Sequence, residues 1–234
     1  MPTPVHQLLQ LQSQITQCSR CDRLRQHCVN IGIVKRRAYR TETYWSRPVP
    51  SFGDPAAEVL ILGLAPGAHG ANRTGRMFTG DSSGDFLYRV LHKTGYASQP
   101  ESRSAGDGLA LTGAYITASA HCAPPDNKPT RAEIAACRPY LTREFELLTK
   151  LKVVVALGRI AFDNYLDLLL DSGAIKRKSA FVFGHGELSY PTLKGPALLA
   201  SYHPSQQNTS TGKLTEPMLL DIFRTARSLS SYAP

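Results

Sequence analysis

Short runs of apolar residues recur along the chain, separated by longer stretches of mixed character. Four runs are rich in aliphatic or β-branched side chains, are bounded by Gly or Pro, and span residues 58–63, 113–120, 152–158 and 196–202. Runs of this length and composition are typical of strands that are buried on both faces. The pattern therefore predicts four buried, parallel strands.

The stretches between the predicted strands carry apolar residues at helical spacing. Helices are predicted over residues 82–94, 130–148, 158–171 and 214–229, with a further short helix over residues 5–17. Thr130 and Glu133 form the pattern of a capping box at the start of one helix. Strands that alternate with helices indicate a parallel sheet covered on both faces. The predicted fold class is α/β, a three-layer α/β/α sandwich around a central four-stranded, mainly parallel sheet.

The length of 234 residues and the 42% hydrophobic content suit one core rather than two. We expect a single domain over residues 1–234, with residues 1–57 as an N-terminal segment within it. No stretch approaches the roughly 20 apolar residues that a membrane helix needs, and the first 17 residues are too polar for a signal peptide. We expect a monomeric, cytoplasmic protein with no membrane partner.

Basic residues outnumber acidic ones, with 27 Lys and Arg against 18 Asp and Glu and a formal net charge of +9. Such charge attracts polyanions, of which nucleic acid is the commonest, although many basic proteins bind none. Basic and aromatic side chains interleave in the segment 35–47. This segment either lies along a phosphate backbone or wraps the protein surface, and the pattern favours neither.

The chain has five cysteines, an odd number that argues against a framework of disulfides. Cys18 and Cys21 form a CxxC pair, and Cys122 and Cys137 lie far along the chain. Four thiolates suit either a tetrahedral zinc ion or a four-iron cluster. The alternative is that Cys122 and Cys137 are ordinary buried thiols. Cys28 has no partner in this scheme.

The most unusual residues follow three of the predicted strands, in loops 63–76, 121–129 and 203–213. Since ligands of open α/β sheets bind at the carboxyl ends of strands, we expect these loops to meet around one site. Loop 63–76 is rich in Gly but has neither the GK[ST] ending of a phosphate-binding loop nor the GxGxxG spacing of a dinucleotide site. On its own His203 would be a core or capping histidine. Its position at a strand end favours a functional role.

Three segments in this order, 63–84, 121–129 and 201–215, resemble the family 5 (B-type) uracil-DNA glycosylases, which contain an iron-sulfur cluster. The spacing of the cysteines is similar to that of the cluster ligands in this family and in family 4. The resemblance therefore implies a 4Fe-4S cluster whose ligands are Cys18, Cys21, Cys122 and Cys137. Residues 1–57 would then include a cluster-binding part and the basic connecting segment.

The resemblance implies a monofunctional DNA glycosylase of base-excision repair, which flips a uracil nucleotide out of DNA and hydrolyses its N-glycosidic bond. By resemblance His203 donates a hydrogen bond to a base carbonyl, and Asn127 holds the attacking water. Asp81 is the best nearby carboxylate to polarise this water or to stabilise the sugar cation. An N-cap of the helix that begins near Ser82 explains Asp81 equally well.

The implied base pocket consists of Gly63, Ala65, Gly67, Phe78 and Ala118, with Phe78 stacked on the flipped base. Ala65 lies where related families carry a water-activating acid or amide, so another residue must hold the water. Ala118 offers a methyl group where family 4 has an asparagine that reads uracil. Because an apolar wall rejects analogues weakly, we expect hypoxanthine and xanthine to be substrates besides uracil.

DNA that contains deaminated bases is the implied partner, and phosphate contacts would hold it without reading its sequence. The candidates in the first two loops are Arg73, Arg76 and Lys128, together with the segment 35–47. The third loop adds Pro204, Ser205, Gln206 and Asn208.

Two other functions fit the same residues. One is a non-catalytic iron-sulfur protein that binds damaged DNA and keeps the fold without the reaction. The other is a zinc-stapled nucleic-acid adaptor, in which the cysteines hold a single ion.

Overall fold

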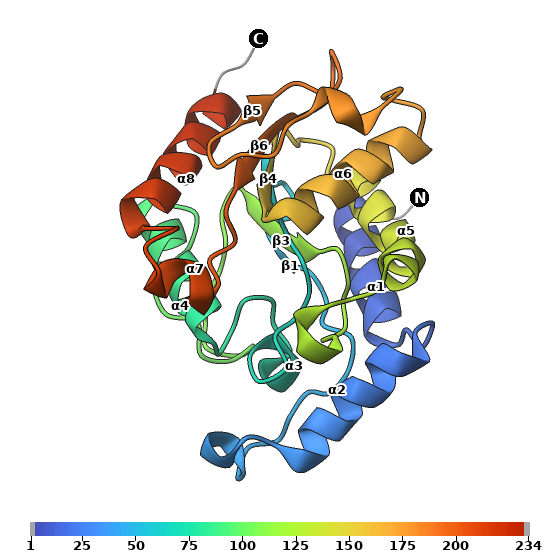
Figure 1. Ribbon diagram of the computed structural model, residues 1–234, viewed down its shortest axis with the longest axis vertical. Coiled ribbons are helices and arrows are strands. Elements are labelled where there is room, and N and C mark those ends of the chain that lie inside the picture. The colour runs from blue at the N-terminus through green and yellow to red at the C-terminus, as the bar shows by residue number, and fades with distance from the viewer. Residues whose placement is uncertain (1–2, 232–234) are drawn as a thin grey trace.

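All residues of the four central strands are buried, because helices cover both faces of the sheet that they form. β2 (Val59–Gly63), β3 (Ala114–Ala118), β4 (Val153–Leu157) and β6 (Ala197–Ser201) run parallel, in the order β3-β2-β4-β6. The computed structural model describes residues 3–231, and Figure 1 shows this sheet between helices. Each of the four strands lies inside its predicted range.

Two further strands extend the sheet to six within the described residues. β1 (Phe52–Gly53) pairs antiparallel with β3, and β5 (Leu188–Ser189) pairs antiparallel with β6. The prediction of four strands missed both edges, because a strand of two residues is too short to leave a periodic pattern.

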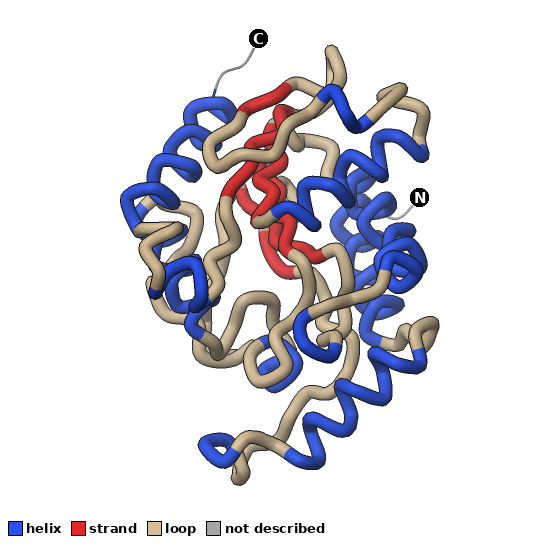
Figure 2. Tube along the Cα trace, in the orientation of Figure 1, coloured by secondary structure: helices blue, strands red, loops and turns tan. Residues whose placement is uncertain are grey.

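Two layers of helices cover the sheet. The first layer contains α4 (Ser82–Lys93) and α8 (Glu216–Ser231), and the second contains α1 (Pro4–Thr16), α5 (Arg131–Leu147) and α6 (Arg159–Asp171). Figure 2 shows the strands in red between these blue helices. The predicted three-layer α/β/α fold is confirmed.

Successive residues of a strand enter different cores, as the alternation of side chains in a strand requires. Val59 and Ile61 pack in the core on the α4 and α8 side, whereas Leu60 and Leu62 pack on the α1, α5 and α6 side. Full burial of one such side chain contributes about 1.5–3 kcal/mol. The strands are therefore held from both faces, and the loops at their carboxyl ends rest on a rigid base.

Local signals determine where the helices begin. The Thr130 hydroxyl accepts a hydrogen bond from the Glu133 N–H at 3.2 Å, and the Glu133 carboxylate accepts one from the Thr130 N–H at 2.7 Å. The predicted capping box at the start of α5 is therefore confirmed. Gly158 adopts a φ of 97°, a conformation that favours Gly, and lets β4 turn directly into α6.

The hydrophobic pattern does not predict α2 (Asp22–Val34), which follows the CxxC pair. Only Leu24 and Cys28 of this helix are buried, whereas Ile33 and Val34 are exposed, so the helix carries no clear apolar stripe. The shorter unpredicted elements are α3 (Ala71–Thr74), α7 (Gln206–Ser210) and the 3-10 turns η1 (Arg37–Tyr39), η2 (Pro125–Asn127) and η3 (Lys178–Ala180). Within residues 3–231, no helix has the length and apolar character that crossing a membrane requires.

Candidate active site

One cavity of about 650 Å³ lies at the carboxyl ends of β2, β3 and β6. Its walls come from all three loops that the sequence singles out. They include Gly63, Ala65, Gly67 and Phe78 from the first segment, Asn127 from the second and His203 from the third. The topology explains this meeting, because parallel strands end at the same edge of a sheet.

The ring of Phe78 lies against the end of β2. Phe78 has a φ of 52°, an uncommon value for a residue other than Gly. A Cβ on Gly63 would lie 3.0 Å from its ring, so the absence of a side chain there lets the ring approach the strand. The centroid of the Phe78 ring is 5.9 Å from that of His203, with an angle of 31° between the planes. An aromatic and an imidazole ring thus lie side by side on the cavity.

Residues of α4 pack against the backbone around Phe78 and hold it in place. A Cβ on Gly84 would lie 1.8 Å from the Phe78 carbonyl oxygen, so only Gly permits this contact. The buried Tyr88 hydroxyl donates to the Met77 carbonyl at 2.9 Å. These contacts keep the left-handed conformation of Phe78 in place and fix the position of its ring.

Asp81 caps α4, and its carboxylate accepts a hydrogen bond from the Gly84 N–H at 3.0 Å through Oδ1. Its Oδ2 atom faces the glycine-rich loop, where a Cβ on Gly70 would lie 2.0 Å from it and a Cβ on Gly67 2.7 Å. Burial raises the pKa of Asp81. The N-cap interpretation is therefore confirmed, and the residue also lines the cavity.

Asn127 lies on the cavity rim in the turn η2. Asp126 and Asn127 have φ values of 53° and 55°, and the Asn127 N–H donates to the Pro124 carbonyl at 3.3 Å. Consecutive left-handed residues are unusual outside Gly, and Asp and Asn tolerate them best. The turn leaves Asn127 exposed on the cavity.

His203 follows directly from β6. Asn208 Nδ2 donates to its carbonyl oxygen at 2.8 Å, and Pro204 beside it is buried, so the backbone at His203 is fixed from both sides. Burial lowers the pKa of His203 to about 4. The imidazole is therefore neutral at physiological pH and carries one N–H that can donate.

Ala118 and Gly63 end two neighbouring strands and face each other in register. Both line the cavity, so this wall presents a methyl group and bare backbone. The sequence did not single out His69, Asp126 and Gln207 as site residues, although they line the same cavity. Only their positions inside the three loops pointed to them.

Residues 50–227 match the family model of the uracil DNA glycosylase superfamily. A type-5 uracil-DNA glycosylase of Thermus thermophilus is 52% identical over 219 residues, which cover 92% of this chain and 95% of the relative. One of Mycobacterium bovis is 47% identical over 95% of this chain and 82% of its own, and one of Pyrobaculum aerophilum is 41% identical over 92% and 89%. The chain belongs to the uracil-DNA glycosylase superfamily. The resemblance to its family 5 is confirmed.

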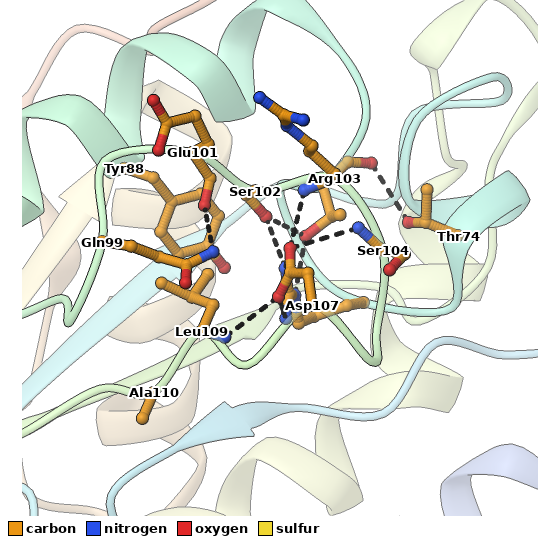
Figure 3. A network of polar contacts seen from close by, with 12 residues as sticks. Thr74, Tyr88, Gln99, Glu101, Ser102, Arg103, Ser104, Asp107, Leu109 and Ala110 are labelled. Carbon is orange, nitrogen blue, oxygen red and sulfur yellow. Dashed lines mark hydrogen bonds and ion pairs between the residues drawn. The ribbon is translucent and has the colours of Figure 1, made fainter.

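Within this superfamily fold, Arg76 is an internal residue rather than a surface cation. Its side chain is only 4% exposed and forms two hydrogen bonds with the Asp107 carboxylate, at 2.8 and 2.6 Å. It also donates to Thr79 and Ser102, and Figure 3 shows Asp107 at the centre of this polar network. The expectation that Arg76 contacts phosphate is therefore corrected, because its guanidinium is buried and each of its three nitrogens has a partner.

The Arg73 side chain is also mostly buried, and its partners are groups of the protein itself. Its guanidinium lies 3.9 Å from the centre of the Tyr39 ring, pairs with Glu42, and donates to the carbonyls of His69 and Gly80. The side chain is 10% exposed. The expectation of a phosphate contact is corrected here too, because Arg73 fastens the segment 35–47 to the glycine-rich loop.

The other proposed DNA contacts differ in exposure. Lys128 and Gln206 are exposed, and Ser205 and Gln206 line the cavity beside His203. Pro204 is buried, and the side-chain amide of Asn208 donates a hydrogen bond to the His203 carbonyl. The third loop thus contains a surface part and a part that shapes the cavity.

A second, smaller cavity lies between α2 and α5, and Cys18, Cys21, Cys122 and Cys137 all line it. Cys28 is buried outside its walls. Arg23 joins the two helices through bonds of 2.8 and 2.7 Å to the Glu133 carboxylate. The CxxC pair and two cysteines about a hundred residues further on therefore line the same cavity.

Two polar atoms on this second cavity have no partner. Arg25 Nη1 and His121 Nε2 are buried without a hydrogen bond among the described residues, and both side chains line the cavity. Buried polar groups are rarely left unpaired, so these two nitrogens fit a cavity that holds a cofactor. Among residues 3–231, however, no group of three or more His, Cys, Asp or Glu is placed to hold a metal ion. The thiols are grouped, but not as ligands of one ion.

Proposed function

We propose that this protein is a monofunctional DNA glycosylase of base-excision repair that flips a uracil nucleotide out of DNA and hydrolyses the bond between base and sugar. One observation carries the proposal: Phe78, Asp81, Asn127 and His203 line a single cavity at the carboxyl edge of the sheet. The relatives that are 41–52% identical are named type-5 uracil-DNA glycosylases. A base inside duplex DNA is out of reach of such a cavity, so the nucleotide has to leave the stack.

Phe78 and His203 act on the base. Phe78 stacks on it, and the neutral His203 donates its N–H to a base carbonyl. When the bond to the sugar breaks, negative charge accumulates on the base, and a donor already aimed at it stabilises that charge. The low pKa of His203 supports this role, because a neutral donor needs no change of protonation state during the reaction.

Asn127 and Asp81 act on the sugar side. The Asn127 amide holds the attacking water, and the Asp81 carboxylate polarises it and stabilises the positive charge on the sugar. No lysine is among the described residues that line the cavity, so no Schiff base forms with the sugar. The base is released and the DNA strand stays intact.

The wall made by Gly63 and Ala118 sets the choice of base. Neither residue has a side-chain polar group that would select the edge of uracil. An apolar wall discriminates weakly, so hypoxanthine and xanthine are substrates besides uracil.

The proposal includes a 4Fe-4S cluster held by Cys18, Cys21, Cys122 and Cys137. The four thiols around one cavity and the unpaired Arg25 Nη1 beside them support it. Four thiolates on one zinc ion, with bonds of about 2.3 Å, need a tight group, whereas a cluster brings its own iron and sulfur between its ligands. When bound, the cluster supplies a cross-link between the N-terminal segment and α5. The formal charge of +9 suits a DNA partner, and we propose that the enzyme acts as a cytoplasmic monomer.

The test uses labelled duplex DNA that contains one uracil. The enzyme is expected to leave an abasic site, which alkali converts to a break, with no break before alkali. His203→Ala and Asn127→Ala are expected to remove most of this activity while DNA binding remains. If the wild type releases no uracil, or if both variants are fully active, a non-catalytic damage-binding protein is the better description.

A further inference from the structure

His69 forms part of the wall between the cavity and the basic segment 35–47. It lies in the glycine-rich loop, is half-buried and lines the cavity. The proposed reaction assigns no task to it. Its ring is nevertheless held in one orientation by a residue from another part of the chain.

That residue is Tyr44. The Tyr44 hydroxyl lies 3.0 Å from His69 Nδ1, and the two rings meet edge to face, with centroids 6.1 Å apart. Burial raises the pKa of Tyr44, so its hydroxyl keeps a proton to donate. An Nδ1 atom that accepts a hydrogen bond leaves the ring proton on Nε2.

The surroundings of His69 are cationic and disfavour a charged ring. Burial, Arg36, Arg73 and His27 together lower the pKa of His69. Arg73 forms an ion pair with Glu42, whereas Arg36 is exposed and forms no ion pair among the described residues. An N–H donor in the electrostatic field of an unpaired guanidinium suits an anionic oxygen and disfavours a cation.

We propose that His69 and Arg36 form a phosphate subsite for the DNA backbone next to the flipped nucleotide. His69 Nε2–H donates to a phosphodiester oxygen, and Arg36 supplies the positive charge. Tyr44 is a positioning residue that holds the proton on Nε2. The inference rests on the proposed function, because the ligand is the backbone of the DNA substrate. It also gives the segment 35–47 a task, since this segment contains both Arg36 and Tyr44.

A scan of single phosphates tests the subsite. Binding is measured by fluorescence anisotropy on duplexes that carry non-hydrolysable 2′-fluoro-2′-deoxyuridine, with each nearby phosphodiester replaced in turn by an uncharged methylphosphonate. In the wild type, one replacement is expected to weaken binding roughly tenfold or more. In His69→Leu that replacement is expected to have no further effect, because the contact is already absent. Unchanged sensitivity at every phosphate in His69→Leu overturns the subsite.

Matched variants separate the roles of the three residues. His69→Gln retains an N–H near the position of Nε2 and is expected to restore most of the affinity. Arg36→Ala is expected to reduce the slope of log affinity against log salt by about 0.9, the value for one phosphate. His69→Leu leaves this slope unchanged, since the ring is neutral. The exposed Arg224→Ala serves as the charge-matched control, and an equal loss of slope there overturns the role of Arg36.

Nitrogen NMR tests the positioning role without any DNA. The wild type is expected to show His69 protonated on Nε2, and Tyr44→Phe a mixture of both tautomers. Protonation on Nδ1 in the wild type overturns the assignment. Release of uracil is assayed in parallel. An enzyme that neither binds nor cleaves refutes the proposed function. An enzyme that releases uracil, but whose sensitivity to each phosphate replacement is the same in the wild type and in His69→Leu, refutes the subsite alone.

Discussion

The Asp81 carboxylate fills the bend of the glycine-rich loop so closely that a Cβ on Gly70 would lie 2.0 Å from its Oδ2 atom. Gly70→Ala must therefore move the carboxylate or the loop. A shift of about 1 Å at a reacting group lowers the rate roughly 100-fold, and we expect a loss of this size in single-turnover release of uracil. Gly106→Ala is the matched control, because that glycine is exposed and a Cβ there meets nothing within 4 Å. Full activity in Gly70→Ala would show that the carboxylate position is unimportant.

Asp81 has two tasks that two substitutions separate. Asn is as good an N-cap as Asp, so Asp81→Asn is expected to keep the stability of α4 while kcat falls roughly 100-fold through loss of the charge. Asp81→Ala is expected to lose the cap as well, at a cost of about 1 kcal/mol in the free energy of unfolding. Urea unfolding and single-turnover kinetics measure the two effects. If Asp81→Asn reacts at the wild-type rate, the residue is a cap only.

His203 is expected to titrate far below an ordinary histidine. Burial lowers its pKa to about 4 in the folded protein, from an ordinary value of about 6.5. The folded state therefore binds this proton less well than the unfolded state. The contribution of His203 to stability is complete above about pH 6.5 and is lost as the pH falls through about 4. A pH titration of the imidazole by NMR checks this. A midpoint near 6.5 would contradict a neutral donor at this position.

Ala118→Asn is expected to narrow the choice of base. An amide at the end of β3 adds side-chain donors and acceptors to a wall whose side chains have none, and bases whose edges do not match then leave these groups unpaired. Relative to uracil, release of hypoxanthine and xanthine is expected to fall by at least roughly tenfold. The measurement is a panel of DNAs, each with one altered base. A wild type already strict for uracil would refute the interpretation of Ala118.

The cysteines allow a test with a built-in control. Protein purified without oxygen is expected to be coloured and to contain iron, and Cys137→Ser is expected to lose both because that thiol lines the cavity. Cys28→Ser is expected to retain them, since Cys28 packs against Cys122 but lies outside the walls, and its thiol donates to the Ala123 carbonyl. A colourless wild type with bound zinc would refute the cluster and favour a zinc-stapled protein.

The sequence predicts the central fold well, because its signals are local. The four buried runs, the capping box of Thr130 and Glu133 and the N-cap at Asp81 each occupy a few adjacent residues. The edge strands and α2 escape prediction for the opposite reason. Two residues make no pattern, and α2 buries too few side chains to show a stripe.

The side chains at the site are harder to predict than the loops that carry them. Nothing near Arg76 in the sequence distinguishes a surface cation from a buried one, because its partner Asp107 is 31 residues away. The same holds for His69, whose partner Tyr44 precedes it by 25 residues. Loop position is encoded locally, whereas the task of an arginine or a histidine is decided by what folds against it.

The small cavity between α2 and α5 constrains how the protein is made. One wall carries Cys21, and the opposite wall is complete only with Cys137, held close by the bond between Arg23 and Glu133. A nascent chain that has not yet reached residue 137 lacks that wall altogether. A group bound by all four of these thiols could therefore enter only late in synthesis or after release from the ribosome, whereas α1 and α2 already have contacts with earlier residues such as Tyr115 and Ala123.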